Sequence, residues 1–216
     1  MKIGILGTGI VGRTLGDKLS ELGHEVKMGA RQAGNETAVA WASAAGGRAS
    51  AGTFADAAAF GEVILNCTKG EVTLEALRQA GASNLAGKVL VDVANPLDFS
   101  RGFPPSLSTC NTDSLGEQVQ RAFPEARVVK TLNTMWCGIM VDPRRLQGSH
   151  LVFLSGDDAA AKQTMAGLLR EMGWREDEIT DLGGIATARV TEMLLPIWLQ
   201  LYGKRGDGAF NFAIAS

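Results

Sequence analysis

Two hydrophobic patterns alternate along this chain. Short runs of apolar residues, each bounded by glycine or polar residues, predict buried strands. The segments between them carry apolar residues three or four positions apart, which predicts amphipathic helices. Strands are expected over 1–6, 24–28, 48–50, 62–67, 88–93, 127–132, 150–155 and 178–182. Helices are expected over 11–22, 54–60, 72–80, 114–123, 158–172 and 185–202, the last one kinked at Pro196.

This alternation is typical of an α/β fold, a doubly wound parallel sheet of the Rossmann type. The chain has 216 residues, which is room for one domain with a small addition. We therefore expect the sheet domain to span residues 1–182 and a small C-terminal helical addition to span 183–216. Residues 97–112 are rich in proline and serine and are expected to form a loop of functional length.

A Gly-x-Gly-x-x-Gly motif stands between the first strand and the first helix. Gly7 would let the chain turn sharply, Gly9 would let the backbone approach a phosphate, and Gly12 would let helix and strand pack closely. The free N–H groups and positive dipole end of the helix would then hold a pyrophosphate. This position is the context that a dinucleotide site requires. The site is expected to comprise Gly7, Thr8, Gly9, Ile10, Val11 and Gly12.

The end of the second strand favours NADP over NAD. An NAD site usually has Asp or Glu there, but this chain has Ala30 followed by Arg31. A guanidinium suits the 2′-phosphate of NADP, and such a charged hydrogen bond is worth roughly 1.5–3 kcal/mol. Gln32 and Asn35 would add neutral donors. The alternative is that Arg31 is a solvated surface residue.

Charge and cysteine content narrow the classes of binding partner and the cellular compartment that are expected. The 21 basic and 23 acidic residues nearly balance, so neither a nucleic acid nor an anionic membrane is expected as a partner. Cys67, Cys110 and Cys137 are irregularly spaced and indicate a reducing compartment, without a disulfide framework or a metal site. The chain shows no signal peptide and no run of about 18 apolar residues, so a cytoplasmic protein is expected.

Ligands of such sheets bind outside the carboxyl ends of the strands, where the strand order reverses. The loops expected there are 7–12, 29–32, 67–70, 94–96 and 133–137, and a nicotinamide is expected near the last three. Ala94, Asn95 and Asn133 are therefore expected to bind the cofactor. The two amides would either bond the nicotinamide carboxamide or only form turns.

Few side chains suggest direct chemistry. Hydride transfer needs two rings held face to face, and the cofactors supply the reactive atoms. Lys69 is a weak catalytic candidate, because it follows a strand on the ligand side; a solvated surface lysine is the alternative. Lys130, inside a strand, is expected to be structural. His24 and His150 lie before strands, so neither is well placed to act as an acid. This disfavours a carbonyl reductase, because that enzyme must protonate an alkoxide.

Segments in chain order carry a family resemblance: 5–9, 29–31, 85–97, 128–134, 155–158, 181–183, 188–189 and 210–212. Through them the chain resembles the NADP-dependent reductases of the deazaflavin coenzyme F-420, whose nucleotide domain is shared with six-transmembrane ferric reductases. The resemblance implies that Thr8 to Val11 bind the pyrophosphate and that Ala30 and Arg31 bind the 2′-phosphate. It implies that the nicotinamide and deazaflavin are lined by Cys67, Thr68, Lys69, Asn95, Met135, Trp136 and Cys137.

The chain departs from that family at two places. Members often carry an apolar or Pro-aromatic turn where this chain has Cys67, Thr68 and Lys69. Members with deazaflavin activity tend to have small residues where this chain has Trp136, whose indole would either stack on an acceptor ring or block its pocket.

These observations predict an NADP-dependent oxidoreductase that passes a hydride between NADP(H) and the deazaflavin, or a flavin such as FMN or FAD. The alternatives are an NADPH reductase of another small acceptor, such as a quinone or imine, and a non-catalytic NADPH-binding sensor. The helix over 185–202 is apolar nearly all round, which favours a homodimer. Phe210 and Phe212 would reach the partner or close the acceptor pocket.

Overall fold

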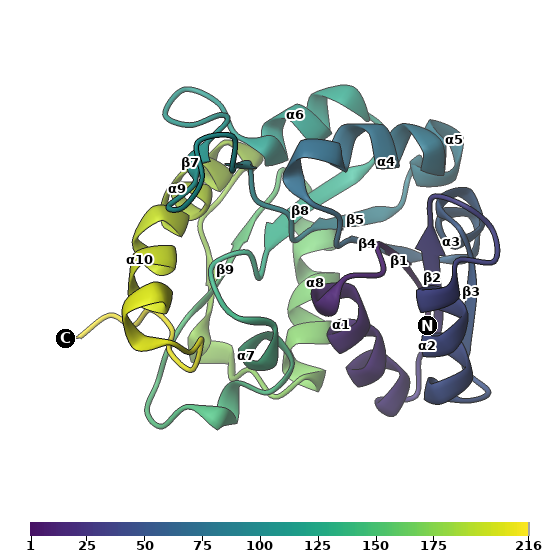
Figure 1. The fold of residues 1–216 in the computed structure, drawn as a ribbon, viewed down its shortest axis with the longest axis horizontal. Coiled ribbons are helices and arrows are strands. Elements are labelled where there is room, and N and C mark those ends of the chain that lie inside the picture. Colours follow the sequence, from purple (N-terminus) through teal and green to yellow (C-terminus); the bar gives the residue numbers. More distant parts are fainter. Residues whose placement is uncertain (216) are drawn as a thin grey trace.

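The fold is built on one central sheet, as the computed structural model of residues 1–215 shows (Figure 1). Its eight strands are β1 (Lys2–Leu6), β2 (Glu25–Ala30), β3 (Ala49–Thr53), β4 (Val63–Asn66), β5 (Val89–Asp92), β8 (Arg127–Thr131), β9 (Val152–Ser155) and β10 (Ile179–Asp181). They lie in the order β10-β9-β8-β5-β4-β1-β2-β3. The order reverses between β1 and β4, which confirms the predicted Rossmann-type α/β fold.

The sheet is mostly rather than wholly parallel, which corrects the expectation at one edge. β9 pairs antiparallel with β8, and β10 runs parallel to β9. Between β8 and β9 the chain forms only the helix α7 (Cys137–Val141) and a 3-10 turn (Pro143–Arg145). The 5 residues of α7 rise about 7.5 Å, too little to carry the chain back along the sheet as a parallel pair requires. The loops after β9 and β10 therefore leave at the opposite edge from those after β1 and β4.

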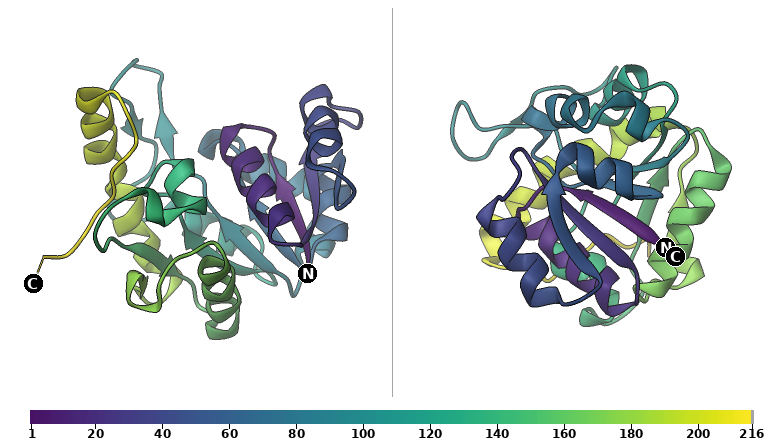
Figure 2. Two further views of the ribbon diagram at one scale, coloured as in Figure 1. Left: turned by 90° about the horizontal axis from the view of Figure 1, so that it is seen from below. Right: turned by 90° about the vertical axis from the view of Figure 1, so that its right-hand side faces the viewer.

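Helices cover both faces of the sheet (Figures 1 and 2). One face carries α1 (Ile10–Glu21), α2 (Glu36–Ala45), α7 and α8 (Ala159–Glu171). The other carries α3 (Phe54–Phe60), α4 (Thr73–Ala80), α5 (Ala82–Leu85), α6 (Leu115–Ala122) and α9 (Ala188–Met193). The hydrophobic pattern did not indicate α2, because its alanine-rich sequence buries only Ala38 and Trp41. Within residues 1–215, no helix is long and apolar enough to cross a membrane.

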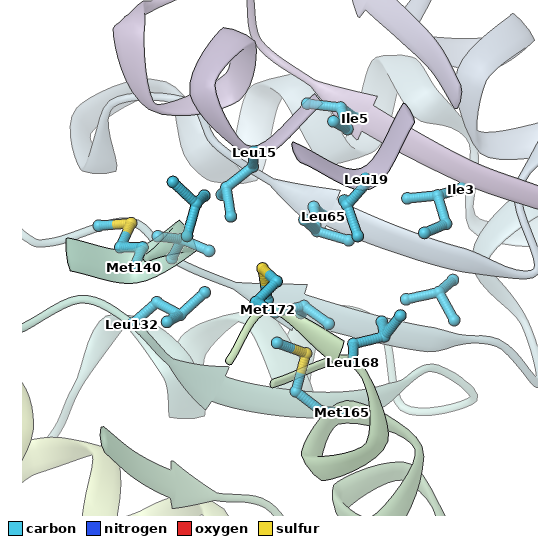
Figure 3. Close-up of a cluster of buried hydrophobic side chains, with 14 of the residues drawn as sticks. Ile3, Ile5, Leu15, Leu19, Leu65, Leu132, Met140, Met165, Leu168 and Met172 are labelled. Carbon is cyan, nitrogen blue, oxygen red and sulfur yellow. The ribbon is translucent and has the colours of Figure 1, made fainter. Parts of the chain in front are cut away.

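Apolar side chains fill the space on each side of the sheet. Ile3 and Ile5 of β1 belong to one cluster with Leu15 of α1 and Leu168 of α8 (Figure 3). Leu6 belongs to the cluster on the other face. Strands that are buried on both faces consist of nearly continuous apolar residues. Each fully buried Leu or Ile contributes roughly 1.5–3 kcal/mol, so the apolar runs locate the strands reliably.

The C-terminal region is broken where the sequence predicts a kink. Instead of one helix over 185–202, the chain forms a 3-10 turn (Ile185–Thr187), then α9 and α10 (Leu195–Arg205). Pro196 has no N–H for the carbonyl four residues earlier, and its ring crowds that carbonyl. A new helix therefore begins at this point, with the proline in its first turn.

The tail after α10 lies against the start of β9. Leu151 donates its N–H to the Phe212 carbonyl at 2.9 Å, and Asn211 Nδ2 donates to the Leu151 carbonyl at 2.9 Å. Figures 1 and 2 place this tail at the end of the molecule opposite α2. The division into functional units 1–182 and 183–216 stays a prediction, and residue 216 lies outside the described residues.

The proline- and serine-rich segment 97–112 is a loop with one small hairpin. Two short strands, β6 (Leu97–Asp98) and β7 (Ser106–Leu107), pair antiparallel within it. Phe103 at its tip is 61% exposed. The Phe103 ring lies beside Gly203 of α10, so the hairpin tip and α10 share one surface.

Candidate cofactor site

A cavity of about 450 Å³ lies where the strand order reverses, at the carboxyl ends of β1, β2 and β4. It is lined by Gly7, Thr8, Gly9, Ala30, Arg31, Gln32, Asn35, Phe54, Cys67, Thr68, Lys69 and Val72. The cavity thus brings together three of the loops that the sequence predicts as cofactor-binding. Sequence reasoning missed Phe54 and Val72, because only their position beside these loops distinguishes them from core residues.

The three glycines of the motif have the geometry that a bound phosphate needs. Gly7 has φ 119°, and a Cβ on it would lie 2.8 Å from the Cys67 carbonyl oxygen. A Cβ on Gly12 would lie 2.3 Å from the Gly7 carbonyl oxygen, so α1 can pack on the turn only with glycine there. Around Gly9, the N-cap of α1, residues 1–215 place no atom within 4 Å of the Cβ position apart from the adjoining backbone. The backbone at Gly9 is therefore open to a close ligand, and the residues present fit a pyrophosphate.

The turn after β2 contributes Arg31, the cation of this cavity that lies nearest to α2. Arg31 is exposed and forms no hydrogen bond or ion pair with another group of residues 1–215. Asn35 accepts the Ala38 N–H at 3.1 Å through Oδ1, which caps α2 and leaves the Asn35 amide nitrogen as a free donor. The turn therefore offers a guanidinium and an amide donor, as the 2′-phosphate would require.

Asn66, the last residue of β4, is fully buried and fixes the loop that follows it. Asn66 Nδ2 donates to Asp92 Oδ1 at 2.8 Å and to Thr73 Oγ1 at 3.2 Å. Asn66 Oδ1 accepts the Thr68 hydroxyl at 2.7 Å and the Thr68 N–H at 3.3 Å. Both donors of Thr68 are thus occupied within the protein, so Thr68 contributes shape to the cavity wall rather than a free donor.

The two cysteines near the site have different surroundings. Burial raises the pKa of the Cys67 thiol, and the charge of Asp92 raises it further. Cys137 is buried in the core, where its sulfur accepts the Thr14 hydroxyl at 3.7 Å. Because the thiolate is the reactive form, the raised pKa disfavours a nucleophile at Cys67, which serves the cavity as a small side chain.

The loops after β5 and β8 bind each other through their amides. Asn95 Nδ2 donates to the Asn133 carbonyl at 2.9 Å, and Asn133 Nδ2 donates to Asn95 Oδ1 at 2.9 Å. Leu132, just before Asn133, has φ 62°, a left-handed conformation that costs a residue with a side chain about 1–3 kcal/mol. Strain of this kind concentrates at functional loops. The amides that the sequence suggests for the nicotinamide carboxamide therefore hold these two loops together.

Several expected cofactor residues lie under the site rather than in it. Ala94, Met135 and Cys137 are buried in the apolar clusters, so they support the loops from within. The expectation that they bind the cofactor directly stays untested, and their burial assigns them a packing role in this structure.

A buried charge cluster lies beneath the same loops. Lys130 Nζ is 2.8 Å from Asp92 Oδ2 and 2.8 Å from Glu192 Oε1, and it also donates to the Ala94 carbonyl. Burial lowers the pKa of Lys130, but the two carboxylates outweigh it and leave this pKa raised, so the ammonium stays charged. The cluster joins β5 and β8 to α9. The sequence places Lys130 in an apolar strand but does not show which carboxylates meet it.

The Trp136 side chain packs between α7 and the C-terminal tail. A Cβ on Gly138 would lie 2.3 Å from the Trp136 ring, and a Cβ on Gly208 would lie 2.6 Å from Trp136 Cβ. The Arg145 guanidinium lies 5.9 Å from the ring centroid. Trp136 does not line the cavity described above. The tail, rather than the nucleotide loops, thus sets the position of this indole.

Both histidines make structural contacts away from the cavity. His24 Nε2 lies 2.8 Å from Glu171 Oε2, at the end of α8. His150 Nε2 lies 2.9 Å from the Pro143 carbonyl, and His150 Nδ1 lies 2.9 Å from Asn211 Nδ2. These partners occupy both ring nitrogens of His150, so its ring links β9 to the tail.

Known proteins share this architecture. A family model described as "NADP oxidoreductase coenzyme F-420-dependent" matches residues 2–96. The chain is 52% identical to a candidate F-420-dependent NADP reductase from Arthrobacter sp. FB24, whose solved structure matches it over 100% of both chains with a TM-score of 0.93.

More distant relatives show how widely the fold occurs. The metalloreductase STEAP3 of Rattus norvegicus is 32% identical over 203 residues, which is 91% of this chain but only 38% of that protein. The hypothetical protein SMa0349 from Sinorhizobium meliloti shares the fold at 23% identity, with 88% of each chain covered and a TM-score of 0.70. The full-length match at 52% identity, together with the Rossmann cavity, places this chain in the family of F-420-dependent NADP oxidoreductases, as an NADP-dependent oxidoreductase.

Proposed function

We propose that this protein transfers a hydride between NADP(H) and the deazaflavin coenzyme F-420. The observation that carries the proposal is the cavity beside β1, which contains two cations, Arg31 and Lys69, and no carboxylate. The acceptor is supported by the full-length likeness to the Arthrobacter protein. Because the cofactors contain the reacting atoms, the protein has only to bind and orient them.

Each part of the cavity has a role in this proposal. The first turn of α1 holds the pyrophosphate, since the N–H groups of Ile10 and Val11 have no carbonyl partner within the helix. Arg31 holds the 2′-phosphate, with Gln32 and Asn35 beside it. When bound, NADP supplies the nicotinamide that carries the hydride. The loops after β5 and β8, held together by Asn95 and Asn133, position that ring.

The proposed acceptor can be tested by stopped-flow absorbance. Protein and NADPH are mixed with the deazaflavin, with FMN and with FAD in parallel, and NADH replaces NADPH as the control. We expect rapid loss of the oxidised deazaflavin band with NADPH, and a much slower change with either flavin or with NADH. NADPH binding without oxidation by any of the three would contradict the proposal and favour another acceptor or a sensor. Faster reduction of FMN or FAD would replace the deazaflavin by a flavin.

We also propose that the protein is a homodimer that pairs through α10. Ile197 is 53% exposed on this helix, Leu201 and Tyr202 are exposed beside it, and Phe103 of the hairpin extends the same surface. Apolar surface of this kind, on one helix and an adjoining loop, is typical of an interaction face. A stable interface buries about 1,200–2,000 Å² in total, which α10 and the hairpin together would have to supply.

Ile197→Glu is expected to convert the dimer into a monomer, because the change places a charge at the most exposed apolar residue of α10. Sedimentation velocity measures the mass directly. Val39→Glu, the same kind of change at an exposed apolar residue of α2 at the opposite end of the molecule, is the matched control and should leave the mass unchanged. A wild-type protein that sediments as a monomer at all concentrations would contradict the proposal.

A further inference from the structure

Lys69 and Arg31 approach the cavity from two sides of β1. Arg31 follows β2 and Lys69 comes shortly after β4, and these two strands flank β1 in the sheet. Neighbouring strands lie about 4.8 Å apart, so β2 and β4 are separated by roughly 10 Å. Long side chains that extend from both sides can span that distance to a single anion. Both residues line the same cavity.

Neither cation has a partner of its own. Within residues 1–215, the Lys69 ammonium and the Arg31 guanidinium form no hydrogen bond and no ion pair, whereas Arg121 is paired with Asp113 at 2.9 Å. The nearest acidic residues along the chain, Glu36 and Glu71, line other cavities. Two unpaired positive charges in a cavity without a carboxylate repel each other, and an anion bound between them would offset that repulsion.

The turn that carries Lys69 is rigid, although its side chain is free. The Lys69 carbonyl accepts the Val72 N–H at 3.1 Å and the Thr73 hydroxyl at 3.2 Å. On the other side of the turn, a Cβ on Gly70 would lie 2.0 Å from the Asn95 carbonyl oxygen, so this glycine packs against the backbone after β5. The backbone of the turn is thereby fixed at a point where Lys69 lines the cavity.

We propose that the Lys69 ammonium binds the 2′-phosphate of NADP together with the Arg31 guanidinium. Lys69 is then a specificity-determining residue, and its role is to select NADP rather than to transfer a proton or to line the nicotinamide, as the family resemblance implies. The proposal rests on the proposed function, in which the 2′-phosphate lies at Arg31. A dianionic phosphate between one planar fork of donors and one compact ammonium satisfies both cations.

Binding of 2′,5′-ADP and of ADP tests the proposal without any acceptor, because the two ligands differ in the 2′-phosphate. Calorimetric Kd values are measured for the wild type, Lys69→Ala, Lys69→Arg and the control Lys204→Ala. We expect Lys69→Ala to weaken 2′,5′-ADP by about tenfold or more and ADP by less than about twofold. Lys69→Arg should restore most of the loss, and the control should match the wild type.

Two results would overturn the proposal. Equal weakening of both ligands would place Lys69 at the phosphates that NADP and NAD share, and no weakening of either would make it a solvated lysine. The double variant Arg31→Ala/Lys69→Ala should lose less than the sum of the single changes, because both side chains bind one phosphate. A wild type that does not prefer 2′,5′-ADP to ADP would instead remove the 2′-phosphate from Arg31, and the proposed NADP site would fail as well.

Discussion

Replacing Lys130 with methionine is expected to lower the free energy of unfolding by about 3–5 kcal/mol. The change removes the one positive charge of a buried cluster and leaves the Asp92 and Glu192 carboxylates in the core without it. Methionine keeps a similar volume, so the loss comes from charge and hydrogen bonding rather than from a cavity. A typical domain is stable by only 5–15 kcal/mol, and such a loss is a large part of that margin.

Urea unfolding followed by circular dichroism measures this effect. The matched control is Lys18→Met, which breaks an ion pair with Glu21 on the surface of α1 and is expected to cost no more than about 1 kcal/mol. A double variant with Glu192→Gln should show strong coupling to Lys130→Met, because both changes act on one cluster. A loss below about 1 kcal/mol for Lys130→Met would mean that the cluster is solvated in solution.

The effect of Lys130→Met should not depend on pH between about 7 and 9. The raised pKa of Lys130 means that the folded state holds its proton more tightly than the unfolded state does. The stability that this group contributes is therefore fully present below the unfolded pKa of about 10.4 and is lost as the pH rises through the folded pKa. A difference between variant and wild type that disappears near neutral pH would contradict a charged Lys130.

Arg31→Asp is expected to reverse the cofactor preference. Removing the guanidinium should weaken NADPH binding about ten- to a hundredfold, and the new carboxylate adds repulsion toward the 2′-phosphate. The same carboxylate can accept a hydrogen bond from the 2′-hydroxyl of NADH, as in NAD-binding Rossmann folds. The wild type and the variant should therefore prefer opposite cofactors.

Quenching of tryptophan fluorescence gives the Kd of NADPH and of NADH for each protein. Arg31→Gln separates the two causes, because it removes the charge without adding a carboxylate; it should lose NADPH affinity and gain no NADH affinity. An unchanged ratio of the two Kd values in Arg31→Asp would exclude Arg31 from the 2′-phosphate site and would also remove the basis for the role proposed for Lys69.

Local features of the chain could be predicted because their physical causes are local. The close approach of Gly12 to the Gly7 carbonyl lies within the turn itself, and the positive φ of Gly7 is a property of its own backbone. The break before α10 follows from the missing N–H of Pro196. The helix α2 escaped prediction, because Asn35 is a local cap signal but the burial of Trp41 depends on packing against α1.

Features that join distant segments could not be predicted in the same way. The reversal of β9 depends on how far the segment before it travels, which its composition does not show. Asn95 and Asn133 follow two strand ends, and from the sequence either amide could bind a nicotinamide. Only the fold shows that these two residues bind each other. The position of the Trp136 side chain likewise depends on contact with Gly208, which is distant in the sequence.

The sequence by itself determined the α/β class, the strands and the glycine-rich turn before α1, because apolar periodicity and glycine geometry act over a few residues. The tertiary structure alone decided the partners of charged and polar side chains. Lys130 meets Asp92 and Glu192 because β5, β8 and α9 converge there. Lys69 shares a cavity with Arg31 because β2 and β4 flank β1. These placements affect stability and ligand binding, since a charge removed from water must find a partner or a ligand.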